Sequence, residues 1–593
     1  METIGAMVRS RVETYNDRVM MKDKRGGSWK SITWQEFWNS ARSIGLGLIA
    51  SGIKPGDRIA IFSPNSPEWE MVDIGSLSIG AIDVPLYSTI TARQAEFILE
   101  DSGSRIVFVG SEQLLDRVLE VRDGIPSLEK IVTMFETECT HPDVISWSAF
   151  KKIGDEHPGQ DEFETRLEAT GPDDVASFVY TSGTTGNPKG VMLTHDNFLS
   201  NVEAASSLVE VGKDDVCLSF LPLSHSLERM SGYYTSVFNG VTIAHATSID
   251  HLLEEMGEIR PHYMVSVPRL YEKVHAGILA NIDKESPFKQ KVFHWAVEVG
   301  QQVSRLQLDH KPVPAGLKLK HQLAGMLVFS KIKAKMGGRL RFFFSGGAPL
   351  AKEIGEFFHS MGILILEGYG LTETSPVITV NRPDALRFGT VGQVLPGVEV
   401  KIADDGEILA RGPNIMLGYW NRPEATEESL EGGWFHTGDI GYLDSEKFLH
   451  ITDRKKDIIV TSGGKNVAPQ NIENTLKMDR YIEQVCVIGD KRKYLSALIV
   501  PCFEELEAWA KAEDIPCEDK IVLINSSKVN AFFKERIDRA LKDFAKFEKI
   551  VQFTLLPEEL TVESGLLTPT LKVRRRQVME TYEGEISSMY GGE

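Results

Sequence analysis

Cysteine is scarce in this chain, and its few copies lie far apart. The 593 residues include five cysteines, none of them in a C-x-x-C pair: Cys139, Cys217, Cys486, Cys502 and Cys517. This spacing favours neither a zinc site nor a disulfide framework. We therefore expect free or buried thiols in a reducing compartment.

Long apolar runs are also missing. No stretch reaches the roughly 18 apolar residues that a membrane-spanning helix needs. Residues 1–16 carry charges and lack the apolar centre of a secretory signal. We expect a cytoplasmic protein, and we expect any contact with the inner face of the membrane to be peripheral.

Basic residues are outnumbered by acidic ones. The chain has 65 Lys and Arg against 84 Asp and Glu, a formal net charge of −19. Phosphate backbones attract clustered Lys and Arg, so this balance argues against a nucleic-acid partner. It remains compatible with a local basic pocket for a small anionic ligand.

The hydrophobic pattern predicts an α/β protein. Thr33 and Glu36 form a capping box before an amphipathic helix that Gly52 ends, and a short apolar strand follows at 58–62. Repetition of this pattern predicts βαβ units and parallel-rich sheets. From about 390 to 449, short β-prone runs and turns predict a small antiparallel subdomain.

A dense charged segment, Asp453–Asp457, precedes a renewed α/β pattern. We place a domain boundary there, with a large N-terminal domain at 1–452 and a small α+β C-terminal domain at 453–593. The segment reads as an exposed linker that would suit either a mobile hinge or a static turn.

The segment Tyr180–Gly190 alternates glycines with small hydroxyl residues and ends near one lysine. Such a loop can direct backbone N–H groups, hydroxyls and an ammonium toward a polyanion, although a mobile Gly/Ser/Thr linker has the same composition. Lys189 lies between Pro188 and Gly190, so the segment does not match the G-x-x-x-x-G-K-[ST] phosphate loop.

Three predicted apolar strands end in glycine-containing or polar turns. In each case the turn comes directly after its strand: the strand 215–220 is followed by 221–225, the strand 341–344 by 345–349, and the strand 363–366 by 367–373. Open α/β sheets bind ligands at such strand ends. Three of them together predict a composite site at one sheet edge.

Several motifs, in this order, resemble those of the AMP-forming acyl-CoA synthetases of the adenylate-forming superfamily. They are Tyr180–Gly190, Leu221–His225, Gly368–Glu373, Thr437–Asp439, Asp453–Asp457 and Pro569–Lys572. The resemblance covers nearly the whole chain. It implies ATP, a carboxylic acid and coenzyme A as substrates, Mg²⁺ as cofactor, and a mobile C-terminal domain.

The resemblance also assigns residues to the phosphate end of the site. The residues that would bind the β- and γ-phosphates are Thr181, Ser182, Gly183, Thr184, Thr185, Gly186 and Lys189. Glu373 would hold Mg²⁺, which prefers oxygen ligands. Thr372 would contact the α-phosphate, and His225 would lie near the carboxylate of the acid.

At the nucleoside end, two glycine-containing segments would enclose adenine. They supply Gly347, Ala348, Pro349, Gly368, Tyr369 and Gly370. Asp439 would accept hydrogen bonds from the ribose hydroxyls, with Arg454 nearby.

The C-terminal domain would supply the remaining groups. Lys572 would bridge carboxylate and α-phosphate during adenylation, as a flexible ammonium can. Asp453 would be the hinge about which the domain rotates. The rotated domain would present Gly463, Gly464 and Lys465 to the coenzyme A channel.

Three features are similar to long-chain members: Ser226–Arg229, the helical insertion at 283–336, and Leu567–Thr570. We therefore expect a long-chain fatty acid as substrate. Activation of a medium-chain, aryl or polyketide-type acid, or transfer to a carrier protein, is the alternative. A phosphotransferase is disfavoured by the loop spacing. An inactive lipid-binding scaffold is disfavoured because Lys572 and Glu373 are present.

Overall fold

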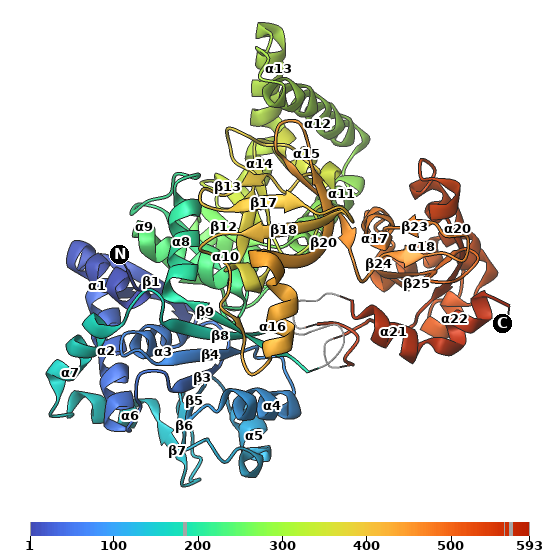
Figure 1. Ribbon diagram of the computed structural model, residues 1–593. Helices are drawn as coiled ribbons and strands as arrows, with labels where there is room; N and C mark the ends of the chain where they lie inside the picture. Colours follow the sequence, from blue (N-terminus) through green and yellow to red (C-terminus); the bar gives the residue numbers. More distant parts are fainter. Residues whose placement is uncertain (1, 182–186, 562–563, 569–572, 592–593) are drawn as a thin grey trace.

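The computed structural model describes residues 2–181, 187–561, 564–568 and 573–591. Figure 1 shows a large body built from the first three quarters of the chain and a smaller lobe beside it, built from the last part. The large body contains three sheets and the smaller lobe two.

The first sheet of the large body has eight strands. In spatial order they are β19 (Gly418–Tyr419), β9 (Lys189–Thr194), β8 (Val175–Thr181), β4 (Ile82–Leu86), β3 (Arg58–Phe62), β5 (Ile106–Val109), β6 (Lys130–Thr133) and β7 (Val144–Ser146). The strands from β8 to β7 run parallel, as predicted. The β8–β9 pair is antiparallel, with Thr181 opposite Lys189, on either side of residues 182–186 in the chain.

The second sheet has nine strands. In spatial order they are β16 (Gln393–Val394), β15 (Val377–Val380), β14 (Leu364–Gly370), β13 (Phe342–Ser345), β12 (Tyr263–Ser266), β10 (Val216–Ser219), β11 (Thr242–His245), β1 (Val19–Arg25) and β2 (Ser28–Thr33). Its central strands are parallel, which brings the carboxyl ends of β10, β13 and β14 to one edge. The three strand ends that were predicted to form a composite site therefore lie at one edge of this sheet.

A third, antiparallel sheet confirms the small β subdomain. Its strands are β17 (Glu399–Ile402), β18 (Glu407–Arg411), β20 (Phe435–Leu443) and β21 (Leu449–Arg454).

Helices connect and cover the strands of the large body. In chain order they are α1 (Ile4–Tyr15), α2 (Trp34–Ala50), α3 (Pro67–Leu77), α4 (Ala92–Ser102), α5 (Glu112–Glu120), α6 (Trp147–Asp155), α7 (Gln160–Ala169), α8 (His195–Ser206), α9 (Thr235–Asn239), α10 (Leu252–Ile259), α11 (Pro268–Asp283), α12 (Pro287–Leu308), α13 (Ala315–Ala324), α14 (Ser330–Lys335), α15 (Lys352–Ser360) and α16 (Pro423–Ser429). Two π-helical segments, η2 (Glu228–Tyr234) and η3 (Gly325–Phe329), precede α9 and α14. None of the helices in the described ranges is long and apolar enough to cross a membrane.

The smaller lobe has its own apolar core between strands and helices. Its strands are β22 (Ile459–Val460), β23 (Asn466–Val467), β24 (Ile482–Ile488), β25 (Leu495–Pro501) and β26 (Ile550–Leu555). Its helices are α17 (Pro469–Lys477), α18 (Phe503–Ala512), α19 (Lys520–Ile524), α20 (Ser527–Ala540), α21 (Arg575–Thr581) and α22 (Glu583–Met589).

The capping box predicted at Thr33 forms as expected. The Glu36 N–H donates to the Thr33 hydroxyl at 3.2 Å, and the Thr33 N–H donates to the Glu36 carboxylate at 2.8 Å. Two of the orphan N–H groups at the start of α2 are thereby satisfied. The helix then buries Trp34, Phe37 and Trp38 in the main core.

A fully buried guanidinium links the two large sheets. Arg229, in η2, forms ion pairs with Asp73 of α3 and Asp83 of β4. It also donates to the Ser177 hydroxyl of β8 at 2.8 Å and to the Tyr234 hydroxyl at 2.9 Å. All these side chains are buried, so each charge depends on its partners.

This arrangement predicts a large cost for removing the guanidinium. Arg229→Met leaves two buried carboxylates without their cation, so we expect the free energy of unfolding to fall by about 3–5 kcal/mol. Urea unfolding followed by circular dichroism measures this change. Arg411→Met is the control, because Arg411 pairs with Glu399 on the surface, where ion pairs contribute about 0–1 kcal/mol. Equal midpoints for the two variants would contradict the prediction.

Candidate functional site

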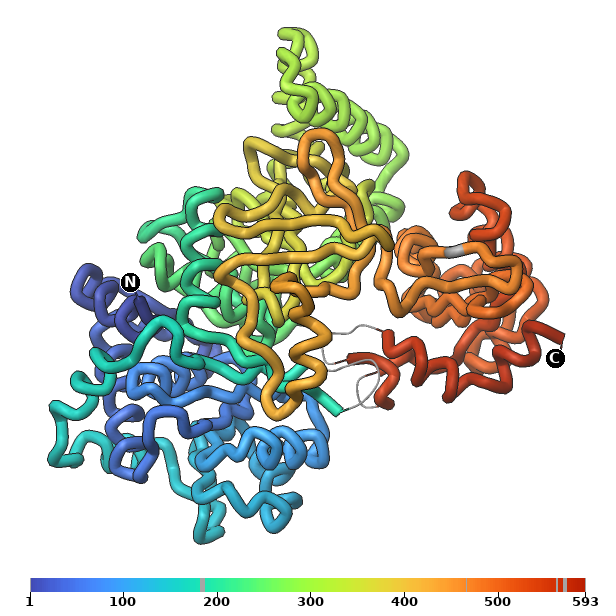
Figure 2. Tube along the Cα trace, in the orientation of Figure 1, coloured from blue at the N-terminus to red at the C-terminus, as the bar shows by residue number. Residues whose placement is uncertain are grey.

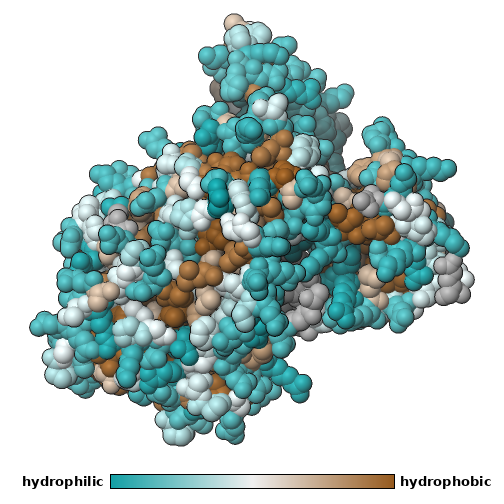
Figure 3. Space-filling model, in the orientation of Figure 1, coloured by the Kyte–Doolittle hydropathy of each residue, from teal (hydrophilic) through white to brown (hydrophobic). Residues whose placement is uncertain are grey.

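A cleft of about 3640 Å³ runs between the large body and the smaller lobe. Figure 3 shows the surface hollowed where the two parts meet. This volume is several times that of a typical pocket for one small ligand, so it has room for more than one. The predicted residues that line it are Thr181, Lys189, His225, Gly347, Ala348, Pro349, Gly368, Tyr369, Gly370, Thr372, Glu373, Asp439, Asp453 and Arg454.

Two of the residues predicted to bind phosphate, Thr181 and Lys189, lie on the paired strands β8 and β9. Thr181 ends β8 and pairs in register with Lys189, which begins β9. The Lys189 ammonium lies 4.7 Å from the centre of the Tyr419 ring, a cation–π contact. Both residues line the cleft. The predicted residues Ser182, Gly183, Thr184, Thr185 and Gly186 lie outside the described residues.

Tyr419 connects this lysine to the predicted metal ligand. Its hydroxyl donates to the Glu373 carboxylate at 2.9 Å. No sequence pattern predicts a role for Tyr419, because an aromatic residue in a short strand carries no mark of function.

Glu373 lies in a 3₁₀ turn, Thr372–Thr374, that follows β14. Within the described ranges, no group of three or more His, Cys, Asp or Glu side chains is arranged to hold a metal ion. A Mg²⁺ ion at Glu373 would therefore take its other oxygens from phosphate and water, which is how Mg²⁺ usually binds beside nucleotides. A single cleft-lining carboxylate fits that arrangement.

The segment that carries His225 meets Thr372 through Ser226, near the ends of β10 and β14. The Leu227 N–H donates to His225 Nδ1 at 3.0 Å, so the neutral ring carries its proton on Nε2. The ring lies edge-on to Tyr87, with centroids 6.3 Å apart. Ser226 and Thr372 share a hydrogen bond of 3.3 Å. This hydrogen bond links the motif Gly368–Glu373 to the residue that directly follows the motif Leu221–His225.

Three residues predicted to bind the nucleoside, Tyr369, Asp439 and Arg454, form a hydrogen-bonded set. The Tyr369 hydroxyl donates to one oxygen of Asp439 at 2.6 Å, and Arg454 Nε donates to the other at 3.0 Å. Asp439 and Arg454 face each other across β20 and β21. Burial and the adjacent Asp439 raise the pKa of Tyr369, which keeps its hydroxyl protonated as a donor.

The prediction that Gly368–Gly370 form a turn is wrong. These residues continue β14 and pair antiparallel with β15. A Cβ on Gly370 would lie 1.6 Å from the Pro376 carbonyl oxygen, so close strand approach explains this glycine.

Glu367 is a cleft residue that sequence analysis missed. It is buried at the end of the apolar part of β14, accepts a hydrogen bond from the Leu350 N–H at 3.0 Å, and has its pKa raised by burial to about 8. A charged residue directly after the run Ile363–Leu366 was the available signal.

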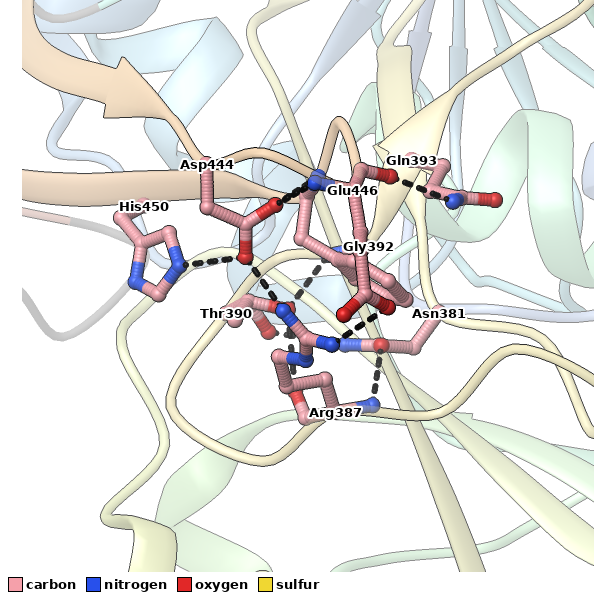
Figure 4. Close-up of polar contacts among 9 residues, drawn as sticks. Asn381, Arg387, Thr390, Gly392, Gln393, Asp444, Glu446 and His450 are labelled. Carbon is pink, nitrogen blue, oxygen red and sulfur yellow. Dashed lines mark hydrogen bonds and ion pairs between the residues drawn. The ribbon is translucent and has the colours of Figure 1, made fainter. Parts of the chain in front are cut away.

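A polar network fixes the loop that follows β15. Figure 4 shows Arg387 pointing between Asp444 and Glu446 of the β20–β21 turn, at 2.5 and 2.7 Å. Partial burial tends to raise the pKa of Asp444, but hydrogen bonds, including one from the Phe448 N–H, lower it to about 2. Asn381 spans the same loop by donating to the Thr390 carbonyl at 2.8 Å. Thr390 lines the cleft, so the network shapes the cleft wall.

Asp453 is not in an exposed linker. It lies in β21, is 6% exposed and has one carboxylate oxygen with no hydrogen-bond partner among the described residues. Burial raises its pKa to about 7. Arg575 and Glu473 of the smaller lobe, joined by an ion pair of 2.7 Å, also act on its charge. The carboxylate therefore lies where the two parts meet.

Three predicted residues lie away from the cleft. Gly463, Gly464 and Lys465 form an exposed turn between β22 and β23 and do not contribute to the described cleft lining. The Lys465 ammonium lies 5.9 Å from the ring centre of Phe547 instead. Lys572 falls outside the described residues, as do the other residues of Pro569–Lys572.

Comparison with known proteins agrees with this arrangement. The AMP-binding enzyme family matches residues 8–420, and its C-terminal domain matches residues 456–593. The long-chain-fatty-acid–CoA ligase FadD15 of Mycobacterium bovis is 34% identical over 100% of this chain and 98% of that protein. The peroxisomal long chain acyl-CoA synthetase 6 of Arabidopsis thaliana is 34% identical over 95% of this chain and 82% of its own length.

Solved structures show the same fold. The anthranilate CoA ligase AuaEII, in complex with anthranoyl-AMP, superposes with a TM-score of 0.75 at 18% identity, over 99% of this chain and 98% of that one. A Mycobacterium tuberculosis fatty acyl CoA synthetase superposes with a TM-score of 0.62 at 24% identity, over 98% and 99%. From its sequence and its fold, this chain belongs to the AMP-binding enzyme family.

Proposed function

We propose that this protein is an AMP-forming long-chain fatty acid–CoA ligase. The observation that supports the proposal is the cleft, whose lining includes Lys189, Glu373, Tyr369 and Asp439 from segments of three sheets. Full-length similarity to long-chain-fatty-acid–CoA ligases supports the choice of acid and of coenzyme A.

The reaction has two halves. A carboxylate oxygen of the fatty acid attacks the α-phosphorus of ATP, the bond to pyrophosphate breaks, and acyl-AMP forms. The sulfur of coenzyme A then loses its proton and attacks the acyl carbon, and AMP leaves. Because a carboxylate is a weak nucleophile toward a tetra-anion, the first half needs oriented cations and donors.

Lys189 and the glycine-rich segment before it would bind the β- and γ-phosphates and orient pyrophosphate as the leaving group. Mg²⁺ held by Glu373 would supply positive charge beside the phosphate oxygens. Thr372 would donate its hydroxyl to the α-phosphate. His225 would donate from Nε2 to the fatty-acid carboxylate, since its Nδ1 is already an acceptor.

Asp439 would accept from the ribose hydroxyls, which would compete with the Tyr369 hydroxyl for the same carboxylate. Tyr369 would then offer its ring face to adenine. Gly347–Pro349, after β13, would form the opposite wall. Arg454 would hold the Asp439 carboxylate in position through its hydrogen bond.

The smaller lobe would act by rotation. In the described arrangement the turn with Gly463, Gly464 and Lys465 does not line the cleft, so coenzyme A delivery along it requires movement of the lobe. Asp453 would be the hinge, and the N-terminal domain would end at 452. Its buried carboxylate supports this role because a change of lobe orientation would change its solvation.

The proposed reaction predicts a specific product set. With ATP, Mg²⁺, coenzyme A and a series of fatty acids, we expect AMP, pyrophosphate and acyl-CoA, with the highest kcat/KM for long chains. Chromatographic separation of AMP, ADP and acyl-CoA measures the outcome. ADP as product would overturn the ligase assignment, whereas a preference for short or aryl acids would overturn only the assignment of chain length.

Substitution of Lys572 should change the rates of the two half-reactions to different extents. Removing the bridging ammonium in Lys572→Ala should slow acyl-AMP formation about a hundredfold or more, the usual cost of losing one group that stabilises transition-state charge. Conversion of supplied acyl-AMP to acyl-CoA should be largely retained. Lys534→Ala, which removes a lysine that pairs with Asp538 in the smaller lobe and does not line the described cleft, is the control and should keep both rates. Equal loss of both halves with the fold intact would contradict the role of Lys572.

Asp453 predicts a pH dependence of stability. Because its pKa is raised from about 4 when unfolded to about 7 when folded, its stabilising contribution is complete below the unfolded value and is lost as pH rises through 7. Asp453→Asn cannot ionise, so its melting temperature relative to wild type should rise from pH 5 to pH 8. Asp404→Asn, on the exposed surface, is the control and should parallel the wild type. Parallel curves for all three proteins would contradict the prediction.

A further inference from the structure

A helical projection stands away from the body of the protein. Figures 1 and 2 both show α12 and α13 extending outward beyond the sheets of the large body. The projection belongs to the insertion at 283–336, to which the catalytic site assigns no role. Its tip is the turn between α12 and α13, near residues 309–314.

The charge of this region is opposite to that of the whole chain. Residues 310–341 contain no Asp or Glu, although the chain has a net charge of −19. Their basic residues are Lys311, Lys318, Lys320, Lys331, Lys333, Lys335, Arg339 and Arg341. Lys318 and Lys320 are exposed and form no ion pair with any described residue.

An apolar stripe runs between these cations. The helix formed by α13, η3 and α14 buries Ala324 and Phe329 against the body. Its outer face exposes Leu319, Leu323, Met326 and Leu327, at 60, 41, 65 and 52%. The spacing of three and four residues places them on one face. Lys318 and Lys320 flank Leu319 in sequence and therefore lie on either side of the stripe.

We propose that this outer face of residues 315–335 docks the protein on the surface of a bilayer that contains anionic phospholipids. An exposed apolar stripe bordered by lysines on a helix is the pattern of interfacial helices, which bury the apolar face at the headgroup boundary. The lysine stems lie along the apolar surface while their ammonium groups reach the phosphates.

Two features of the region favour a membrane over a protein groove as the partner. The face lies on a helical projection that stands out from the body, where a broad surface can approach it (Figure 1). The side of the projection seen in Figure 3 is mostly hydrophilic, consistent with basic residues beside the stripe. Cations without local acidic partners complement anionic headgroups rather than a second copy's basic face.

The test is vesicle binding by the full-length protein without ATP, fatty acid or coenzyme A, so that it does not depend on the proposed enzyme activity. Cosedimentation with vesicles of phosphatidylcholine is compared with vesicles that also contain phosphatidylglycerol. We expect binding only to the anionic vesicles, and release as salt rises, because the attraction decays with the Debye length.

Two variants separate the contributions of charge and apolar surface. The first variant combines Lys318→Gln and Lys320→Gln. The second combines Leu319→Gln, Leu323→Gln and Met326→Gln. Each should weaken vesicle binding about tenfold or more. Ile521→Gln with Val522→Gln is the matched control, because that exposed pair lies in the smaller lobe at 58 and 57% exposure. It should bind like wild type, and melting curves verify the fold of each variant.

Two kinds of result would overturn the inference. The first is the absence of anionic-vesicle binding, or equal binding by all variants. The second is a dimer in sedimentation velocity that the Leu319, Leu323 and Met326 variant abolishes, since the stripe would then join two copies of the chain. Activity on fatty acid in solution should be unchanged in every variant, so loss of vesicle binding and loss of ligase activity remain distinguishable.

Discussion

The buried charge of Arg229 is the interaction on which the arrangement of this site depends. A guanidinium with no access to water needs carboxylates, and here they come from α3 and β4. Because unpaired buried charges are so costly, the η2 segment has one position relative to the eight-stranded sheet. His225 and Ser226 lie one helical turn before Arg229, and the Arg229 N–H donates to the His225 carbonyl at 3.1 Å. The ion pairs thus position the residues that meet Thr372 in the cleft.

The cleft uses few charges, each with defined partners. Lys189, Glu373 and Tyr419 form one connected set, and Tyr369, Asp439 and Arg454 form another. The first offers a cation and an oxygen ligand to phosphate. The second offers acceptors and a ring to a nucleoside. An acidic chain can bind ATP in this way because local fields near a cleft, and not the net charge, act on a bound anion.

The sequence predicted the architecture well where local rules act without competition. The capping box at Thr33, the strand at Arg58–Phe62 and the antiparallel sheet near 390–449 follow from local patterns. Gly368–Gly370 were misassigned as a turn because β15, which makes them a strand, pairs with them only in the folded chain. Asp453 was misread as exposed for a similar reason: its burial comes from β20 and the smaller lobe, which a linear charge pattern does not reveal.

The location of Asp453 would allow a rigid strand to carry the proposed hinge. Its main chain pairs with Ile440, so the residue belongs to the sheet of the large body, while charges acting on its side chain come from Arg575 and Glu473 of the lobe. Rotation of the lobe would move those charges and open the carboxylate to water without breaking the β20–β21 pairing. The energetic difference between two lobe orientations would then depend on a few side chains at the strand end, which suits an enzyme that must pass between two half-reactions in each cycle.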